Sequence, residues 1–464
     1  MAGSPCDARA TRIYHGDVTA ENGVPSVLIV GGGLAGLAAA AALGGAGFRV
    51  ELFESRPFLG GRATSYQTGS AEAPGETIDN CQHVLLRCCV NLLDFYRRLG
   101  VAGSIRFHRE FYFVEPGGRT SVLRRGRWGP PAHFLESFVK MRCLGVRDKL
   151  SIVHAMSALA RERTRRPDLD RISMLDWLLQ KRQTPHAIER FWSPVLVSAI
   201  NEDLDGMAAR HGFQVFGLGF LASPDAYEMG LSAVPLGELY DAADWTHAGD
   251  VTLHRRCSVE RIEIEGAGVH GVVAGGGRRA ADYYICAVPF ERVAGIAPEL
   301  GIPADLFQHS PITGIHLWFD RPVTRLPYAT LLDRTIQWMF NKRGGAYLQL
   351  VVSASRDLTS MPRAEVIRLA LDELREFFPA VAGAVLERAH VVKEVRATFS
   401  ARPGTESLRP FAATGVPNLF LAGDWTASGW PATMEGAVRS GYLAAEAVAA
   451  AAGLPAKFLL RDIA

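Results

Sequence analysis

A glycine-rich strand–helix–strand pattern near the start of the chain constrains the fold more than any other feature. Residues 26–30 read as a short buried strand, and the turn G-G-G-L-A-G follows at 31–36. Residues 37–43 are rich in alanine, which favours a helix. Residues 48–53 read as a second strand that ends at Glu54. This order of strand, glycine turn, helix, strand and acid is typical of a dinucleotide-binding unit in a parallel sheet.

The residues of this turn match what a pyrophosphate requires of a protein backbone. Gly31 permits the tight turn, Gly33 lets the backbone approach the phosphates, and Gly36 lets helix and strand lie close together. Leu34 and Ala35 lie in this turn, just before the N-terminus of the helix, whose free N–H groups and partial positive charge attract phosphate oxygens. The sequence therefore predicts a phosphate-binding turn, with an accidental glycine-rich loop as the alternative.

The residues after the second strand extend the predicted nucleotide site. Glu54 can accept hydrogen bonds from both hydroxyls of a ribose, and its charge would repel a 2′-phosphate. Ser55 and Arg56 follow directly, and Gly61 and Arg62 lie in a G-G-R turn shortly afterwards. We include these residues among the cofactor-binding candidates, with a solvated turn arginine as the alternative for Arg62.

A second glycine-bearing segment lies near the end of the chain. Residues 418–422 read as an apolar strand that leads to Gly423 and Asp424. Thr433 and Met434 then open a helix whose first turns carry small residues, so that it can approach another helix closely. The N-terminus of this helix favours a negatively charged group.

Together these motifs resemble the FAD-dependent amine oxidase and carotenoid desaturase superfamily. The resemblance is carried by the first glycine turn, the G-G-R turn, the A-G-D-W segment at 422–425 and T-M-E-G-A-V-R-S-G at 433–441. It implies FAD as the cofactor. No histidine or cysteine stands at an obvious attachment point, so we expect FAD to be held noncovalently. It also implies that Arg62 lies near the flavin and that the backbone of Val259 meets the adenine. Asp424 is expected at the ribityl–phosphate region, and the helix after Thr433 at the flavin pyrimidine.

The resemblance also implies the architecture. We expect an α/β fold with a Rossmann-type FAD-binding domain of the GR2-like flavoprotein kind and an inserted substrate domain of mixed sheet and helices. The first insert has a largely helical pattern, and the second has strand-like stretches and one helix. The expected boundaries are a flexible tail over 1–24, an FAD-binding domain over 24–103, 238–298 and 405–455, and a substrate domain over 104–237 and 299–404.

The stretch T-I-D-N-C-Q-H-V-L-L at 77–86 places hydrogen-bonding side chains directly against an apolar run. This mixture is typical of the edge of an apolar pocket. The form D-N-x-Q-H resembles the hydroxysqualene dehydroxylase branch of the superfamily, as does the segment 191–205. That branch usually has glycine where this chain has Cys81 and Arg87. Thr433 stands where amine oxidases usually carry a tyrosine of their aromatic cage, which argues against an amine substrate.

The resemblance implies a reaction on a long isoprenoid. Hydroxysqualene carries an allylic alcohol, whose protonation and loss of water would leave a cation that accepts hydride from the reduced flavin, giving squalene. Asp79 and His83 are the candidates for the proton donor. The alternative is that Asp79 caps a turn and His83 has a structural role. An external electron donor is expected. Two other functions remain open, a carotenoid or phytoene-type desaturase and a prenyl-lipid-binding module.

Composition limits the partners further. The 464 residues are 48% hydrophobic and 21% charged, as in an ordinary globular enzyme, and the net charge of +2 gives no reason to expect nucleic acid binding. His309 and His316 have no partners at metal-ligand spacing, so we expect no metal. Residues 133–150 favour a core-facing amphipathic helix, with peripheral contact to an anionic membrane as the alternative. We expect a cytoplasmic protein, with a place at the inner face of the membrane as an alternative.

Overall fold

The predicted glycine-rich unit forms the centre of a parallel sheet. The computed structural model describes residues 23–69 and 74–463, so the predicted tail over 1–24 lies almost entirely outside the described residues. Strand β1 (Ser26–Val30) pairs in parallel with β2 (Arg49–Phe53), and α1 (Leu34–Gly45) connects them. Helix α1 is buried from Leu34 to Gly44, and its small side chains allow neighbouring elements to approach on several sides.

Distant segments of the chain complete this sheet in the order β10–β2–β1–β14–β20. Strands β10 (Val251–His254), β14 (Tyr283–Cys286) and β20 (Leu419–Leu421) each pair in parallel with their neighbours. Because the strands are parallel, their carboxyl ends lie along one edge, where α/β proteins bind ligands. The strands come from all three segments that were predicted to form the FAD-binding domain.

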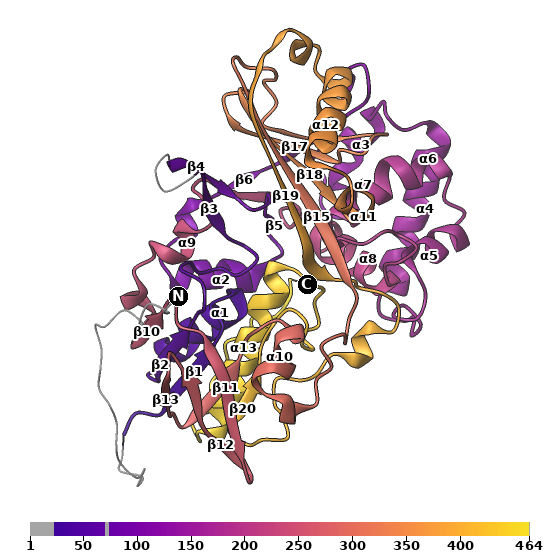
Figure 1. Cartoon of the computed structure of the whole chain (residues 1–464). Coiled ribbons are helices and arrows are strands. Elements are labelled where there is room, and N and C mark those ends of the chain that lie inside the picture. Colours follow the sequence, from indigo (N-terminus) through magenta and orange to yellow (C-terminus); the bar gives the residue numbers. More distant parts are fainter. Residues whose placement is uncertain (1–22, 70–73, 464) are drawn as a thin grey trace.

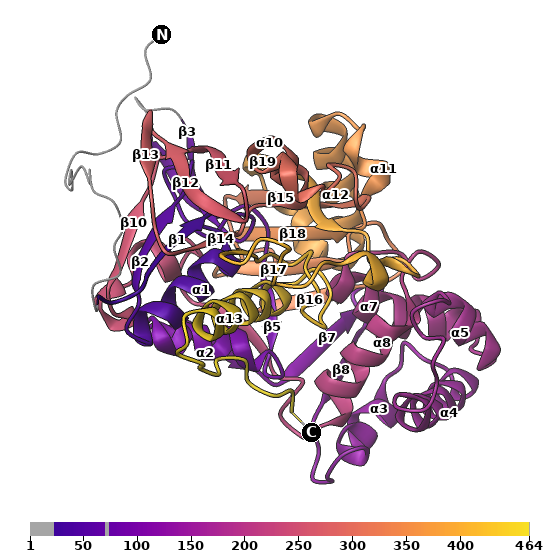
Figure 2. The same ribbon diagram turned by 90° about the horizontal axis from the view of Figure 1, so that it is seen from below.

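The last helix, α13 (Met434–Ala451), lies beside α1 (Figure 2). A Cβ atom built on Gly441 would stand 2.2 Å from the carbonyl oxygen of Ala35 in α1. Only glycine therefore permits this approach, which brings the N-terminus of α13 to the same edge of the sheet as the glycine turn.

A small antiparallel sheet follows β10. It consists of β11 (Val259–Glu265), β12 (Gly268–Ala274) and β13 (Gly277–Arg279), in that order. Ala274 pairs with Gly277, so β12 and β13 form a hairpin whose turn contains Gly276, with a φ of +75°. Helix α10 (Phe290–Ile296) lies after β14.

A larger mixed sheet forms the upper half of Figure 1, with α12 (Arg363–Phe377) packed against it. Its strand order is β19–β15–β18–β17–β16–β7–β8. The strands are β7 (Glu110–Val114), β8 (Thr120–Arg124), β15 (His309–Phe319), β16 (Tyr328–Leu331), β17 (Trp338–Arg343), β18 (Tyr347–Ser353) and β19 (Leu386–Phe399). The first insert was expected to be largely helical, but it also contributes β7 and β8. Strand β7 joins the sheet through the parallel pairing of Phe113 with Thr330.

Helices from the first insert lie at one end of this sheet, at the right of Figure 1. They are α3 (Leu135–Lys140), α4 (Val146–Glu162), α5 (Met174–Gln180), α6 (Pro185–Ala187), α7 (Ser193–Ile200) and α8 (Ala209–Phe216). Trp177 and Trp192 are fully buried among them, with ring centroids 6.3 Å apart. Across residues 23–69 and 74–463, we find no helix with the length and apolar character needed to cross a membrane.

Shorter elements connect the two halves. They are the hairpin β3 (Ser65–Gly69) and β4 (Pro74–Asp79), the sheet of β5 (Val84–Leu86), β9 (Met229–Ser232) and β6 (Ile105–His108), and the helices α2 (Val90–Arg98), α9 (Glu238–Asp241) and α11 (Arg356–Thr359). The polar stretch before β5 therefore lies between the parallel sheet and the mixed sheet.

Candidate cofactor and substrate site

A cavity of about 810 Å³ lies where the two glycine-bearing segments meet. It begins at the carboxyl edge of the parallel sheet and extends to α7 and the mixed sheet. Predicted cofactor residues from both ends of the chain line it, namely Gly31, Gly33, Leu34, Ala35, Glu54, Ser55, Arg56, Gly61, Arg62, Val259, Gly423, Asp424, Thr433 and Met434.

The glycine turn owes its shape to two close backbone approaches. Gly31 has a φ of +112°, and a Cβ there would stand 2.7 Å from the carbonyl oxygen of Ala287. Gly36 supports the turn from within α1, because its Cβ would stand 2.0 Å from the carbonyl oxygen of Gly31. The turn is therefore held between β1, β14 and the start of α1.

The two early glycine turns lie against each other. Gly60 N–H donates to the carbonyl oxygen of Gly32 at 2.9 Å, and a Cβ on Gly61 would stand 3.1 Å from Gly33 Cα. In the part of the chain that the structure describes, no side chain caps the N-terminus of α1 at Gly33, so the first N–H groups of the helix are available to a ligand. This arrangement fits the pyrophosphate of a dinucleotide.

Glu54 is buried at the end of β2 and has both carboxylate oxygens engaged. Oε2 accepts a hydrogen bond from Gly32 N–H at 2.8 Å, and Oε1 accepts one from Arg56 N–H at 2.8 Å. Oε1 also accepts a hydrogen bond from Ser55 Oγ at 3.2 Å, so Oε2 is the oxygen that can accept a second hydrogen bond. Glu54 can therefore fix the turn and still bind a ribose, which agrees with the donor and acceptor pattern of FAD.

Arg62 and Asp424 connect the G-G-R turn to the segment after β20. Arg62 Nη2 donates to Asp424 Oδ1 at 2.6 Å, and its Nη1 donates to the carbonyl oxygen of Ala397 at 2.9 Å. Arg409, which was not predicted as a site residue, lies buried behind this segment and donates to the carbonyl oxygen of Asp424 at 2.9 Å. Nothing in its sequence context distinguishes Arg409 from a surface arginine.

The N-termini of α13 and α2 meet at Glu435. Thr433 caps α13 by accepting a hydrogen bond from Gly436 N–H at 3.1 Å. The carboxylate of Glu435 accepts hydrogen bonds from the amide of Asn91 at 2.8 Å and from Leu92 N–H at 2.7 Å. Burial raises the pKa of Glu435 to about 7, although these hydrogen bonds lower it. Glu435 also lines the cavity and was not predicted as a site residue.

Asp79, a predicted proton donor, is not among the residues that line the cavity. Its Oδ1 accepts hydrogen bonds from Ser65 Oγ at 2.7 Å and from Leu236 N–H at 2.9 Å. Its Oδ2 lies 3.4 Å from Lys342 Nζ, which also donates to Gln82 Oε1 at 2.9 Å. Asp79 therefore lies behind the cavity wall, where its hydrogen bonds hold residues 77–86 in place, as a residue with a structural role would.

His83, the other candidate, does line the cavity. Its Nδ1 lies 3.0 Å from the carbonyl oxygen of Cys81 and must carry the proton, because a carbonyl only accepts. Burial lowers the pKa of His83. The carbonyl of Cys81 and the carboxylate of Asp79 raise this pKa, but their effect is smaller than that of burial. In the neutral ring, Nε2 is therefore an acceptor.

Asn80 and Cys81 complete this wall. The amide nitrogen of Asn80 donates to the carbonyl oxygen of Arg62 at 2.7 Å, while its Oδ1 is buried and has no hydrogen-bond partner among the described residues. Burial raises the pKa of the Cys81 thiol to about 12, which keeps it neutral. This oxygen of Asn80 is a further polar group at the cofactor end of the cavity, and Asn80 was not predicted as a site residue.

The far part of the cavity is largely apolar. It is lined by Phe111, Trp338, Phe340 and Val351, and by the buried Thr330, whose hydroxyl has no hydrogen-bond partner within residues 23–69 and 74–463. Such a wall suits a hydrocarbon chain. Among residues 23–69 and 74–463, no group of three or more His, Cys, Asp or Glu side chains is arranged to hold a metal ion.

Comparison with known proteins agrees with this geometry. A sequence profile described as flavin containing amine oxidoreductase matches residues 34–449. A probable zeta-carotene desaturase of Synechococcus elongatus is 28% identical, with 93% of this chain and 100% of that protein aligned. A hydroxysqualene dehydroxylase of Sinorhizobium fredii is 29% identical, with 91% of this chain and 97% of that protein aligned.

Solved structures show the same fold at low sequence identity. An oxidoreductase from Methanosarcina mazei has a TM-score of 0.67 at 18% identity and aligns with 90% of this chain and 98% of its own. Cyclohexylamine oxidase from Brevibacterium oxydans has a TM-score of 0.63 at 18% identity and aligns with 93% of this chain and 99% of its own. The chain is therefore an FAD-dependent oxidoreductase that belongs to the flavin containing amine oxidoreductase family.

Proposed function

We propose that the protein reduces hydroxysqualene to squalene, replacing the hydroxyl of an allylic alcohol by hydrogen. The proposal is supported by the apolar far part of the cavity, which suits a long isoprenoid, and by the identity to hydroxysqualene dehydroxylases. The observation that carries it is the contrast between this apolar wall and the few polar groups at the cofactor end.

An amine substrate fits this site poorly. Thr433 occupies the place before Met434, and its hydroxyl is used to cap α13. A positively charged amine in the far part of the cavity would have to be desolvated, which is costly without a partner. A hydrocarbon chain has no such cost there.

The residues of this chain divide the work around the substrate as follows. Reduced FAD, when bound, supplies the hydride. His83 in its protonated form donates the proton with which the hydroxyl leaves as water, and Asn80 Oδ1 accepts a hydrogen bond from that hydroxyl. Asp79 acts as a positioning residue through Ser65 and Leu236. The apolar wall excludes water that would otherwise react with the cation left by the departing hydroxyl. Each turnover consumes two electrons, so an external electron donor is part of the proposal.

Product analysis of the reduced enzyme tests the proposal. The protein is photoreduced without oxygen and mixed with hydroxysqualene, and squalene is measured by gas chromatography in amounts matched to the flavin. Phytoene serves as the control substrate and should leave the flavin reduced. The absence of squalene from a fully reduced enzyme that binds hydroxysqualene would refute the proposal.

A carotenoid desaturase is the second candidate, favoured by zeta-carotene desaturases at nearly equal identity. It would use the same cavity in the opposite redox direction. Oxidised enzyme mixed with phytoene or zeta-carotene would then lengthen the conjugated system, which absorption spectra detect, and squalene would not form from hydroxysqualene.

A further inference from the structure

We infer that the outer face of α3 and α4 binds the surface of an anionic lipid bilayer. This α3–α4 surface is formed by the exposed side chains of Trp128, Leu135, Val139, Val146, Leu150 and Val153. The sequence alone favoured a core-facing helix over 133–150, but the structure has two helices here with apolar side chains exposed. The inference does not depend on which lipid-like substrate the enzyme uses.

Helix α4 has apolar side chains on two faces, and only one of them belongs to the core. Ile152, Ala155 and Leu159 are buried against the protein. Val146 is 74% exposed, Leu150 67% and Val153 51%, and their spacing places them on one side of the helix. The buried face already packs against the core. Packing within the chain therefore does not explain why the second face carries apolar side chains.

Helix α3 extends this surface. Its Phe138 is buried and meets the ring of Phe191 edge-on, with the ring centroids 5.9 Å apart. Phe191 lies just before α7, and α7 lines the cavity. Val139, next to it, is 60% exposed. Lys149 Nζ in α4 donates to the carbonyl oxygen of Val139 at 2.7 Å, so the end of α3 and the start of α4 lie together.

The charge around the surface indicates an anionic partner. Residues 124–150 carry seven Lys and Arg but only two Asp and Glu, in a chain whose net charge is +2. Of the two acids, Glu136 is paired with Arg127 at 3.0 Å, and Asp148 is buried. Arg124 and Arg125 are paired with Glu110 and Asp225 from outside this segment. The exposed basic residues Lys140, Arg142 and Arg147 remain, and they stand next to the exposed Val139 and Val146 along the chain. Apolar side chains ringed by lysine and arginine are the pattern of helices that lie in the interface of anionic bilayers.

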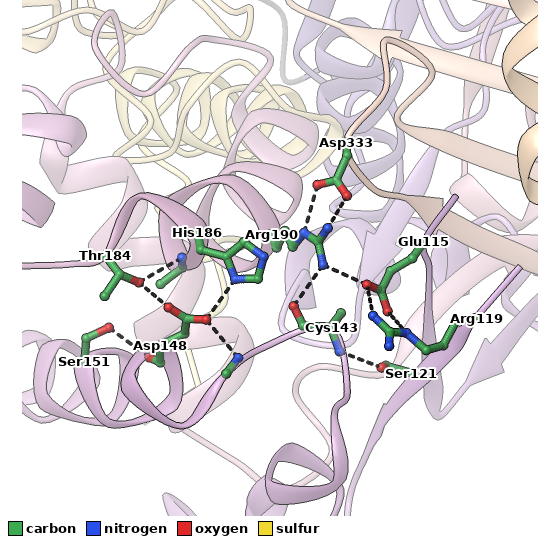
Figure 3. A network of polar contacts seen from close by, with 12 residues as sticks. Glu115, Arg119, Ser121, Cys143, Asp148, Ser151, Thr184, His186, Arg190 and Asp333 are labelled. Atoms are coloured by element: carbon green, nitrogen blue, oxygen red, sulfur yellow. Dashed lines mark hydrogen bonds and ion pairs between the residues drawn. The ribbon is translucent and has the colours of Figure 1, made fainter. Parts of the chain in front are cut away.

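Polar contacts fix this surface to the rest of the protein (Figure 3). Asp148 accepts hydrogen bonds from Gly145 N–H at 2.8 Å and from Thr184 Oγ at 2.6 Å, and its Oδ2 lies 2.8 Å from His186 Nδ1. These contacts hold the first turn of α4 against the start of α6.

Arg190 continues the connection toward the mixed sheet. It donates to Glu115 Oε1 at 2.8 Å, to Asp333 Oδ1 at 2.9 Å and to the carbonyl oxygen of Cys143 at 3.3 Å (Figure 3). Cys143 lies between α3 and α4, so both helices are anchored from their inner side. The exposed face is thus presented in a fixed orientation, as a docking surface requires.

Vesicle binding by the FAD-loaded full chain tests the inference. We expect binding to phosphatidylglycerol-containing vesicles about tenfold tighter than to pure phosphatidylcholine vesicles, and weakened by salt. The double variant Val146→Ser/Leu150→Ser should bind anionic vesicles about tenfold more weakly, because it removes apolar side chains from the interface. The matched control Val385→Ser/Leu408→Ser changes residues that are 60% and 55% exposed elsewhere and should bind like the wild type.

Flavin absorbance and circular dichroism establish that each variant is folded. The variant Arg142→Gln/Arg147→Gln should lose most of the salt dependence while keeping its flavin. Equal binding by the surface and control variants would overturn the inference, as would equal affinity for anionic and neutral vesicles. Sedimentation without vesicles tests whether the surface joins two copies of the chain. If the wild type and the control variant are dimers and Val146→Ser/Leu150→Ser is a monomer, the surface is an interface between copies and the inference is wrong.

Discussion

Arg62 Nη2 donates a hydrogen bond to Asp424 Oδ1 at 2.6 Å, across 362 residues of sequence. The pair joins the turn that follows the first nucleotide motif to the segment that opens α13. Each segment alone forms only part of a cofactor site, and this contact closes the site between them. The ion pair is partly exposed on the arginine side and nearly buried on the aspartate side.

Asp424→Asn is expected to weaken FAD binding about tenfold. The substitution removes the charge that orients Arg62, and a factor of ten corresponds to about 1.4 kcal/mol, near the usual contribution of a charged hydrogen bond. Titration of the apoprotein with FAD, followed by flavin fluorescence, measures the dissociation constant. Asp372→Asn breaks an exposed pair with Arg375 and serves as the control. An unchanged affinity in Asp424→Asn would show that the pair has no role in holding the cofactor.

Gly441→Ala is expected to destabilise the protein by about 1–3 kcal/mol, the usual range for inserting a methyl group into a filled space. Its Cβ would stand 2.2 Å from the carbonyl oxygen of Ala35, so α13 would have to move away from α1. Thermal unfolding of the FAD-loaded protein measures the effect. Gly295→Ala is the matched helical control, because a Cβ there meets no atom of the described residues within 4 Å. Equal melting temperatures for the two variants would contradict the close approach of the helices.

The rate at which hydroxysqualene oxidises the reduced flavin is expected to rise as the pH falls. Burial lowers the pKa of His83, so the protonated ring is a minor form near neutral pH and its fraction grows about tenfold for each pH unit of acidification until the lowered pKa is reached. His83→Gln cannot carry this proton and should be slower and lose the dependence. Stopped-flow absorbance measures the rates, with exposed His247→Gln as the control. A pH profile that His83→Gln leaves unchanged would exclude His83 as the proton donor.

The stability of the protein is expected to fall as the pH rises from about 4.5 to 7, through Glu435. Burial raises the pKa of this carboxyl from its usual 4.5 to about 7, so the folded protein holds a proton that the unfolded chain releases over this range. The loss is on the order of 3 kcal/mol, at about 1.4 kcal/mol for each pKa unit.

Glu435→Gln removes this titration. The free energy of unfolding of the variant, relative to the wild type, should therefore increase between pH 5 and pH 8. Denaturant unfolding at each pH provides the comparison, and Glu365→Gln, on the exposed start of α12, is the control. A constant difference between wild type and Glu435→Gln across this range would contradict the raised pKa.

Some parts of the site could not be predicted from the sequence. Asp79 and His83 are close in the same stretch, yet only His83 lines the cavity, while Asp79 is held by Ser65 and Leu236. Arg409 has no motif around it, and its role depends on the carbonyl groups of a segment folded over it. These assignments depend on contacts between distant residues, which spacing along the chain does not encode.

The sequence by itself determined the nucleotide-binding turns, the strands and helices that carry them, and the family to which the chain belongs. These features follow from local requirements, such as the positive φ at Gly31 and the alternation of strand and helix. The tertiary structure decided which polar groups face the cavity, that β7 and β8 join the mixed sheet, and that the outer face of α4 remains exposed. Burial and pairing are properties of the assembled chain, because each depends on which distant segment covers a given side chain.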